Sequence, residues 1–258
     1  MVEILVEKLK KGISKEEFLR IAKEKYEGFD FESIVDLLRF EGLPLEVRGN
    51  EVILKTAITP YREYEYCVVD IEVNNSKPQV GQVIEIGAVK IKNMEITDSF
   101  EFLIYANDVP IFVEKVTGIN TDMLKNEASQ KEVLRKFRLF LKESVFVAHA
   151  ADFDYGFLAH QFKKENLGEL LNRHLCTLTL AQKTLKASRY GLKYLMEEFD
   201  LPKETHHRAL GDAKTTARIF LKCLNNLPNE IKTVEDLVEY AKPTKSKKKK
   251  KKKFDRIS

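Results

Sequence analysis

Apolar residues recur at helical spacing near the start of the chain, in residues 14–25 and 31–40. Alternating apolar and polar runs follow at 45–54, and Gly49-Asn50 in the middle favours a tight turn between two strands. Two helices and a hairpin predict a small module over residues 1–60 that resembles a winged helix. A packing or partner-binding role without DNA contact fits the same order of elements, since many small domains share it.

Beyond Pro60 the pattern changes from helices to strands. Three strands in succession are predicted before the first long helix, at residues 67–73, 82–91 and 95–104. After them come a helix, a strand and four more helices, at residues 130–142, 145–149, 153–165, 178–186, 191–198 and 209–224. This order predicts a layered α/β domain over residues 61–228.

Residues 229–258 form a distinct C-terminal part. It holds one amphipathic helical pattern at 234–241 and then seven consecutive lysines, Lys247 to Lys253. Adjacent like charges repel one another, so we expect a solvated, disordered tail. The net charge of +4 comes from this tail, since the rest of the chain carries 4 − 7 = −3. The tail either attracts nucleic-acid phosphates or serves as a solubilising end without a partner.

Composition restricts the class of protein further. A chain of 258 residues with 43% hydrophobic residues can bury a sizeable core. No run approaches the roughly 20 apolar residues that span a bilayer, and the first residues lack the pattern of an export signal, so we expect a soluble, cytoplasmic protein without membrane contact. The three cysteines stand far apart and outside any CxxC pattern, which indicates neither disulfides nor a zinc knuckle.

The first candidate for chemistry is the pair Asp70 and Glu72 in the otherwise apolar strand 67–73. Strand side chains alternate, so two residues at this spacing leave the same face of the sheet. Two neighbouring carboxylates on a mostly buried strand repel each other and lose hydration unless a cation compensates them. The pair therefore indicates a metal site, or else a solvated edge of the sheet.

A second acidic position, Asp154, falls in the first turn of the helix that follows strand 145–149. An acid there can complement the helix dipole without any chemical role, and its neighbour Asp152 suits that structural role best. His149, at the end of the strand, fits a hydrogen-bonded structural histidine better than a metal ligand.

The third cluster consists of His207 and Asp212 at the start of the predicted helix 209–224. A separation of five residues within one helix turns two side chains about 140° apart. We therefore expect Asp212 on the helix and His207 on a mobile loop before it. Structural histidines are common, so this cluster alone does not separate a structural role from a catalytic one.

Taken together, the three clusters resemble the exonuclease motifs of the DEDDh (DnaQ-like) 3′–5′ exonuclease family. The matching segments are Asp70-Ile71-Glu72, Asp154 in the pattern H-x-A-x-F-D-x-x-F-L, and His207-Arg208-Ala209-Leu210-Gly211-Asp212-Ala213. Residues 84–89 and 116–120 add to the likeness, which covers residues 66–224 and is greatest to the epsilon proofreading subunit of bacterial DNA polymerase III.

The resemblance implies an RNase H-like mixed sheet flanked by helices, and a hydrolase that releases 5′ mononucleotides from DNA 3′ ends during replicative proofreading. It implies two Mg²⁺ or Mn²⁺ ions held by four carboxylates, those of Asp70, Glu72, Asp154 and Asp212. His207 would accept the proton of the attacking water. Val73 and Ile119 would lie against the terminal nucleotide.

Two positions depart from the family pattern. Relatives commonly have a small hydroxyl residue and a glycine where this chain has Val73-Asn74-Asn75, and asparagine where it has Ala150. Neither change removes an expected metal ligand, so both bear on substrate affinity and not on the chemistry.

Other functions are compatible with the same residues. Related DEDDh enzymes trim RNA, as ribonuclease T and oligoribonuclease do, and the sequence does not show whether a 2′-hydroxyl is accepted. A catalytically silent nucleic-acid-binding module is a further alternative, although all five expected residues are present. The expected partners are single-stranded or frayed DNA 3′ ends and replicative polymerase subunits, with contacts to phosphate, sugar and base faces.

Overall fold

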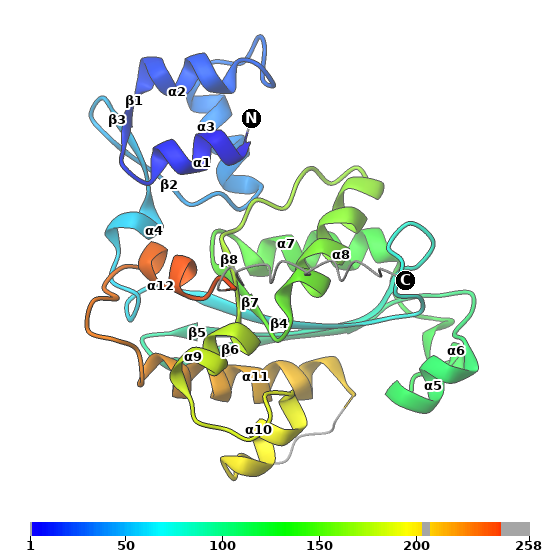
Figure 1. Ribbon diagram of the computed structural model, residues 1–258. Coiled ribbons are helices and arrows are strands. Elements are labelled where there is room, and N and C mark those ends of the chain that lie inside the picture. Colours follow the sequence, from blue (N-terminus) through cyan, green and yellow to red (C-terminus); the bar gives the residue numbers. More distant parts are fainter. Residues whose placement is uncertain (1, 203–206, 244–258) are drawn as a thin grey trace, which may run out of the picture.

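The structure is a computed structural model, and it describes residues 2–202 and 207–243. Its centre is a five-stranded mixed sheet in the order β6-β5-β4-β7-β8 (Figure 1). The strands are β4 (Tyr66–Val73), β5 (Val83–Lys92), β6 (Glu95–Leu103), β7 (Val145–Ala148) and β8 (His174–Cys176). The first three form an antiparallel meander, and β7 and β8 continue the sheet parallel to β4. The predicted α/β class is confirmed.

The meander follows directly from the alternating pattern of the sequence. Its three strands lie within one residue of the predicted bounds. The turn between β5 and β6 places Asn93 and Met94 at φ values of 51° and 67°. Two consecutive residues with positive φ match the twist of paired strands, which is why this hairpin closes so tightly.

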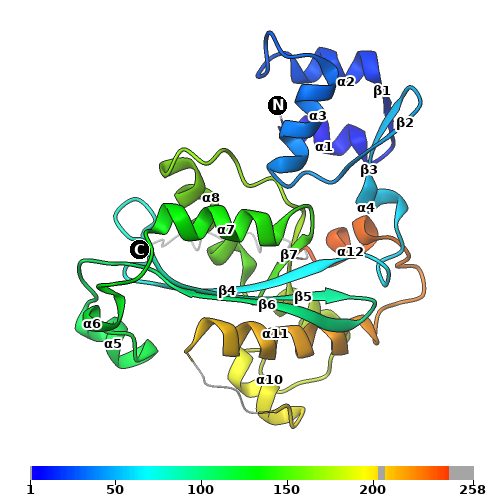
Figure 2. The same ribbon diagram turned by 180° about the vertical axis from the view of Figure 1, so that it is seen from behind.

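Helices cover both faces of the sheet (Figures 1 and 2). One face carries α7 (Gln130–Leu141) and α8 (Ala151–Lys164), and the other carries α9 (Thr177–Thr184), α10 (Leu192–Glu198) and α11 (Ala209–Leu224). Alternation along β4 divides its side chains between the two layers. Val68 packs in the core beneath α11, whereas Val69 packs in the core beneath α7 and α8. Even-numbered residues of β4 therefore face α11.

Two short helices at one end of the sheet were not predicted. They are α5 (Ile111–Thr117) and α6 (Thr121–Leu124), and Gly118 between them has a φ of 72°. Their buried side chains form a small apolar cluster with Ile84 of β5. This cluster closes the end of the sheet at which β5 begins.

The N-terminal part has a core of its own. Its elements are α1 (Val2–Leu9), β1 (Ile13–Ser14), α2 (Lys15–Ala22), α3 (Phe31–Phe40), β2 (Leu45–Arg48), β3 (Glu51–Leu54) and α4 (Lys55–Ile58). The two helices and the hairpin lie where the sequence predicts them, and the unpredicted α1 and β1 complete the module. Its resemblance to a winged helix, and a boundary near residue 60, stay predictions.

The last described helix, α12 (Val234–Tyr240), packs against the central domain. Val234 and Leu237 belong to the same apolar core as Phe220 of α11. The predicted boundary at residue 228 therefore separates α12 from the side chains on which it packs, and we propose that α12 is part of the central domain.

Two further predictions concern the chain as a whole. The lysine run Lys247 to Lys253 lies outside the described residues. Within the parts of the chain that are described, the helices are too short or too polar to cross a bilayer.

Candidate active site

The C-terminal half of β4 carries the first two predicted acids. In the register with β5, Asp70 lies opposite Gly87 and Glu72 lies opposite Glu85. Residues directly opposite in an antiparallel pair share a face of the sheet. Both acids therefore face α11, on the side where Val68 enters the core.

Helix α11 adds a third carboxylate to this pair. Asp212 lies in its first turn and is only 8% exposed. The ligand oxygens of Asp70, Glu72 and Asp212 all lie within 4.8 Å of one another. Three acids from two distant segments thus converge at one point, as the sequence motifs predict.

Asp154 reaches the same strand from α8. The pairing of β7 with β4 ends at Val68, so among the described residues no strand pairs with the β4 backbone beyond it on that side. The Ile71 backbone N–H donates a hydrogen bond to the Asp154 carboxylate there. Asp154 is 5% exposed. Its carboxylate lies near that of Asp70, whose pKa it raises, but it is not one of the three whose ligand oxygens approach within 4.8 Å.

The electrostatics of the cluster are unfavourable without a cation. Burial raises the pKa of Asp70 well above its usual value, and repulsion from Asp154 and Asp212 raises it further. Burial also raises the pKa of Glu72 to about 8, with Glu85 as the largest repelling charge. A divalent ion removes this penalty, and four hard oxygen donors suit Mg²⁺ or Mn²⁺. The residues present therefore fit such an ion.

His207 lies beside Asp212, before α11 begins. It is exposed and has a φ of 56°, and its backbone N–H donates to Asp212 Oδ2 at 3.1 Å. The structure therefore places His207 outside the helix and Asp212 within it, in agreement with the sequence analysis. Whether the segment is mobile stays a prediction.

Two residues near the site were predicted to have structural roles, and the hydrogen bonds of His149 agree with that prediction. Both ring nitrogens of His149 are hydrogen-bonded, Nδ1 with Thr177 Oγ1 at 3.0 Å and Nε2 with the Tyr190 carbonyl at 2.9 Å. Burial lowers the pKa of His149, which favours the neutral ring. Asp152 is exposed in the first turn of α8.

The two predicted nucleotide contacts differ in exposure. Val73 is half-buried at the end of β4, and its contact with substrate stays a prediction. Ile119 is fully buried in the apolar cluster of α5 and α6, so it has no surface for a nucleotide. The turn at Gly118 directs Ile119 inward, and the prediction for Ile119 does not fit this burial. The exposed apolar side chains of this region include Ile111, Phe112 and Val116.

Glu85 belongs to the site but was not singled out from the sequence. It is fully buried, and it lies opposite Glu72. Its carboxylate accepts hydrogen bonds from Arg208 and from the Ala209 backbone N–H. In the sequence, Glu85 could have been recognised as the single carboxylate within the apolar run 83–89 of β5.

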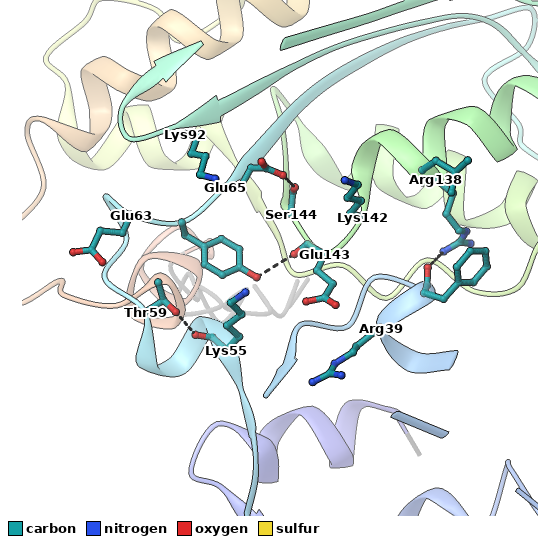
Figure 3. Close-up of a pocket in the computed structure, with 13 residues that line it drawn as sticks. Arg39, Lys55, Thr59, Glu63, Glu65, Lys92, Arg138, Lys142, Glu143 and Ser144 are labelled. Carbon is teal, nitrogen blue, oxygen red and sulfur yellow. Dashed lines mark hydrogen bonds between the residues drawn. The ribbon is translucent and has the colours of Figure 1, made fainter. Parts of the chain in front are cut away.

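A cavity of about 550 Å³ lies at the other end of β4, between the N-terminal module and the central domain (Figure 3). Arg39 and Lys55 of the module and Lys142 and Glu143 of the central domain contribute to its lining. Among the described residues that line it there is none of the five predicted catalytic residues. The cavity is therefore separate from the carboxylate cluster.

A mixed sheet with helices on both faces and clustered carboxylates at the end of its central strand defines a nuclease of the RNase H-like class. The chain belongs to the exonuclease family, since the RNase_T exonuclease family model matches residues 67–220. The family predicted from the three motifs is thereby confirmed.

Similar proteins include DNA polymerases of the PolC type. The chain is 37% identical over 183 residues to DNA polymerase III PolC-type of Thermotoga petrophila, and 39% identical over 201 residues to that of Caldanaerobacter subterraneus. The matches cover 68% and 76% of this chain but only 13% and 14% of those polymerases. The chain thus corresponds to a small part of the length of these relatives.

Solved exonucleases have the same fold. Exonuclease X in complex with 5′-overhanging duplex DNA matches with a TM-score of 0.55 and 21% identity, over 69% of this chain and 99% of that one. E. coli Exonuclease I in complex with a dA16 oligonucleotide matches with a TM-score of 0.59 and 12% identity, over 69% of this chain and 43% of that one. At these identities the likeness concerns the fold, and it confirms the predicted RNase H-like architecture.

Proposed function

We propose that this protein is a metal-dependent 3′–5′ exonuclease that acts on DNA 3′ ends and releases 5′ mononucleotides. The observation that carries the proposal is the convergence of Asp70, Glu72 and Asp212 within 4.8 Å. Asp154, bonded to the strand between the first two acids, supplies the fourth carboxylate. Family membership supports cleavage of nucleic acid, and the PolC-type relatives support DNA as the substrate.

The four carboxylates would hold two Mg²⁺ or Mn²⁺ ions. When bound, such ions neutralise charge on the scissile phosphate and make an attacking water more acidic. The His207 backbone N–H already holds the Asp212 carboxylate at the start of α11, so little rearrangement of this ligand is needed on loading. The exposed imidazole of His207 would accept the proton of the water.

The direct test uses a single strand of DNA labelled at its 5′ end, incubated with Mg²⁺ or Mn²⁺. The wild-type protein should shorten it from the 3′ end in single-nucleotide steps. Asp70→Ala should abolish the activity, and His207→Ala should lower kcat by about 10² to 10⁴. Asp152→Ala is the matched control, because Asp152 is an exposed acid in the same helical turn as Asp154. Equal activity of wild type and Asp70→Ala would refute the proposal.

The choice of DNA over RNA is tested by the same assay on RNA of identical sequence. We expect a higher kcat/KM on DNA. One of the structural neighbours is a 3′-exonuclease that recognises a histone mRNA stem-loop, so the fold accommodates either polymer. A strong preference for RNA would assign the protein to the exoribonucleases instead.

We further propose that the biological role is proofreading beside a replicative polymerase. The similarity to PolC-type polymerases supports it. A mismatched primer terminus frays more readily than a paired one, so the enzyme should remove it faster from a duplex. Co-purification with polymerase subunits would test the partner directly, and equal rates on paired and mismatched termini would contradict the role.

The lysine run Lys247 to Lys253 would add nonspecific affinity for DNA phosphates. Its deletion should weaken binding at low salt and reduce the dependence of log K on log salt, because fewer counterions are released. The value of kcat at saturating DNA should not change. Unchanged binding across a salt series would leave the tail with a solubilising role.

A further inference from the structure

Glu85 is a buried carboxylate that the proposed mechanism does not use. Its Oε1 accepts hydrogen bonds from Arg208 Nε at 2.9 Å and from Arg208 Nη2 at 2.6 Å. Its Oε2 accepts from the Ala209 backbone N–H at 2.9 Å. Both oxygens of one β5 side chain are therefore engaged by the two residues at which α11 begins.

Gly87 lies two residues further along β5 on the same face, and it also contacts the start of α11. A Cβ atom at Gly87 would lie 2.0 Å from the Leu210 backbone nitrogen and 2.1 Å from the Ala209 carbonyl carbon. The first turn of α11 thus rests directly on the β5 backbone, and α11 runs across β4 and β5 (Figure 2). Glu85 and Gly87 together form a seat for this turn.

The seat determines where two of the five predicted catalytic residues lie. His207 immediately precedes Arg208, and Asp212 stands three residues after Ala209 in the same helix. The His207 N–H also bonds to the Asp212 carboxylate at 3.1 Å. A shift of the first turn would therefore displace both side chains relative to Asp70 and Glu72.

A buried carboxylate such as Glu85 is unfavourable for stability if its role is only to support the first turn of α11. Glu85 lies opposite Glu72 and adds to the repulsion among the acids. Replacing buried ion pairs with apolar residues of similar volume is often neutral or stabilising. Two Arg208 N–H groups bind one oxygen of Glu85 and the Ala209 N–H binds the other, and together they fix both distance and orientation, which an apolar contact does not.

We propose that Glu85 is a positioning residue of this exonuclease, which acts through Arg208 and the Ala209 amide to hold His207 and Asp212 in register with the acids of β4. The effect on rate rests on the proposed function. The effect on structure and on cation binding does not depend on it.

The test compares Glu85→Gln with Glu235→Gln. Gln keeps the size of Glu85 and one acceptor, but it removes the charge that Arg208 binds. Glu235 is a matched control because it is 6% exposed and also accepts both arms of an arginine, Arg173, at 2.7 and 2.9 Å. We expect Glu85→Gln to lower kcat about 10- to 100-fold, with KM within about twofold. Glu235→Gln should lower stability but leave kcat per folded molecule unchanged.

A double-mutant cycle tests the route through Arg208. The combined Glu85→Gln and Arg208→Gln variant should lose no more activity than the worse single variant, since both remove one interaction. Arg208→Lys keeps the charge without the planar fork, so it should retain more activity than Arg208→Gln. Additive losses would contradict the pairing.

Two measurements without catalysis complete the test. Glu85→Gln should speed amide hydrogen exchange in residues 207–213 more than elsewhere, and it should weaken Mn²⁺ binding in calorimetry; Glu235→Gln should do neither. If Glu85→Gln keeps the kcat, the exchange rates and the Mn²⁺ affinity of wild type, the positioning role is wrong. It is also wrong if Glu235→Gln loses as much kcat as Glu85→Gln does. A wild-type protein without nuclease activity would refute the proposed function instead, while exchange and Mn²⁺ binding would still test the seat.

Discussion

At Ala150 the backbone adopts a conformation that suits few side chains. The residue is the N-cap of α8, with φ 71° and ψ 48°, and no side-chain hydrogen bond caps the helix. The left-handed region costs an L-residue other than glycine roughly 1–2 kcal/mol, whereas asparagine tolerates it better. The family's preference for asparagine at this position therefore has a physical reason in this chain.

We expect Ala150→Asn to raise the free energy of unfolding by about 1 kcal/mol, through relief of backbone strain and a capping side chain. Urea denaturation monitored by circular dichroism would measure it. Ala150→Gly is the control that relieves the strain without adding a cap, so it should also raise the free energy of unfolding. A less stable Ala150→Asn protein would show that the strain argument is wrong.

Glu72 should make the metal-free protein less stable as pH rises. Its pKa is raised from 4.5 to about 8 in the folded state, so the folded protein binds the proton more tightly than the unfolded chain does. The stability that this tighter proton binding contributes is fully present below about pH 4.5, and it is lost as pH rises toward 8.

The measurement is thermal unfolding from pH 5 to 8.5 in the presence of a chelator. Glu72→Gln stays neutral, so its stability should fall less steeply with pH than that of wild type. Buried histidines whose pKa is lowered, His149 and His174, act in the opposite direction but cancel in the comparison. Parallel curves for the two proteins would contradict the raised pKa of Glu72.

At the scale of elements, two glycines of the central domain should respond oppositely to alanine. Gly87→Ala inserts a Cβ 2.0 Å from the Leu210 nitrogen, so α11 must move; we expect a loss of about 1–3 kcal/mol and weaker Mn²⁺ binding. Gly156 lies within α8, and no heavy atom of the described part of the chain lies near an added Cβ. Gly156→Ala should add about 0.5–1 kcal/mol. Denaturation and calorimetry on both variants would show whether the close approach matters.

The elements that were predicted correctly are those whose burial produces a regular pattern. β4 and β5 are mostly apolar, apolar and polar residues alternate along much of β6, and α7 and α11 carry continuous apolar stripes. Among the helices that were missed, α1 does bury a stripe of Leu5, Val6 and Leu9, whereas α5 and α6 show none. In α5 the apolar residues Ile111, Phe112 and Val116 are exposed, and β8 has only three residues.

The site was predictable only as far as each motif is local. Asp70 and Glu72 are two residues apart on one strand, and His207 and Asp212 flank one helix start, so spacing predicted their neighbourhood. Glu85 and Arg208 are 123 residues apart in sequence, and no local pattern connects them. Their contact follows from the packing of α11 on β5, and the hydrophobic periodicity of the sequence does not predict that packing.

At the scale of the whole molecule, buried polar contacts join the N-terminal module to the central domain. Arg138 of α7 is 6% exposed and donates to the backbone carbonyls of Phe40, Leu167 and Glu169. Phe40 belongs to the module, and the other two belong to the central domain. One guanidinium therefore satisfies acceptors on both sides of the junction.

Arg138→Ala should destabilise the protein by about 3 kcal/mol, because it leaves buried carbonyls without donors. Arg135→Ala removes an exposed arginine from the same helix, and it should change stability by less than about 0.5 kcal/mol. Chemical denaturation of both variants would test this difference. Comparable stability of the two would mean that water replaces the Arg138 contacts.

β4 links the cavity of Figure 3 to the carboxylates, since it starts beside Glu65 in the cavity lining and carries Glu72 at its other end. Seven residues of strand at about 3.3 Å each separate the two by roughly 23 Å. A small molecule lodged in the cavity would not reach the nucleotide being cleaved. Inhibitors that act from there would be noncompetitive with DNA, so a screen at saturating oligonucleotide would distinguish them from compounds that block the cluster.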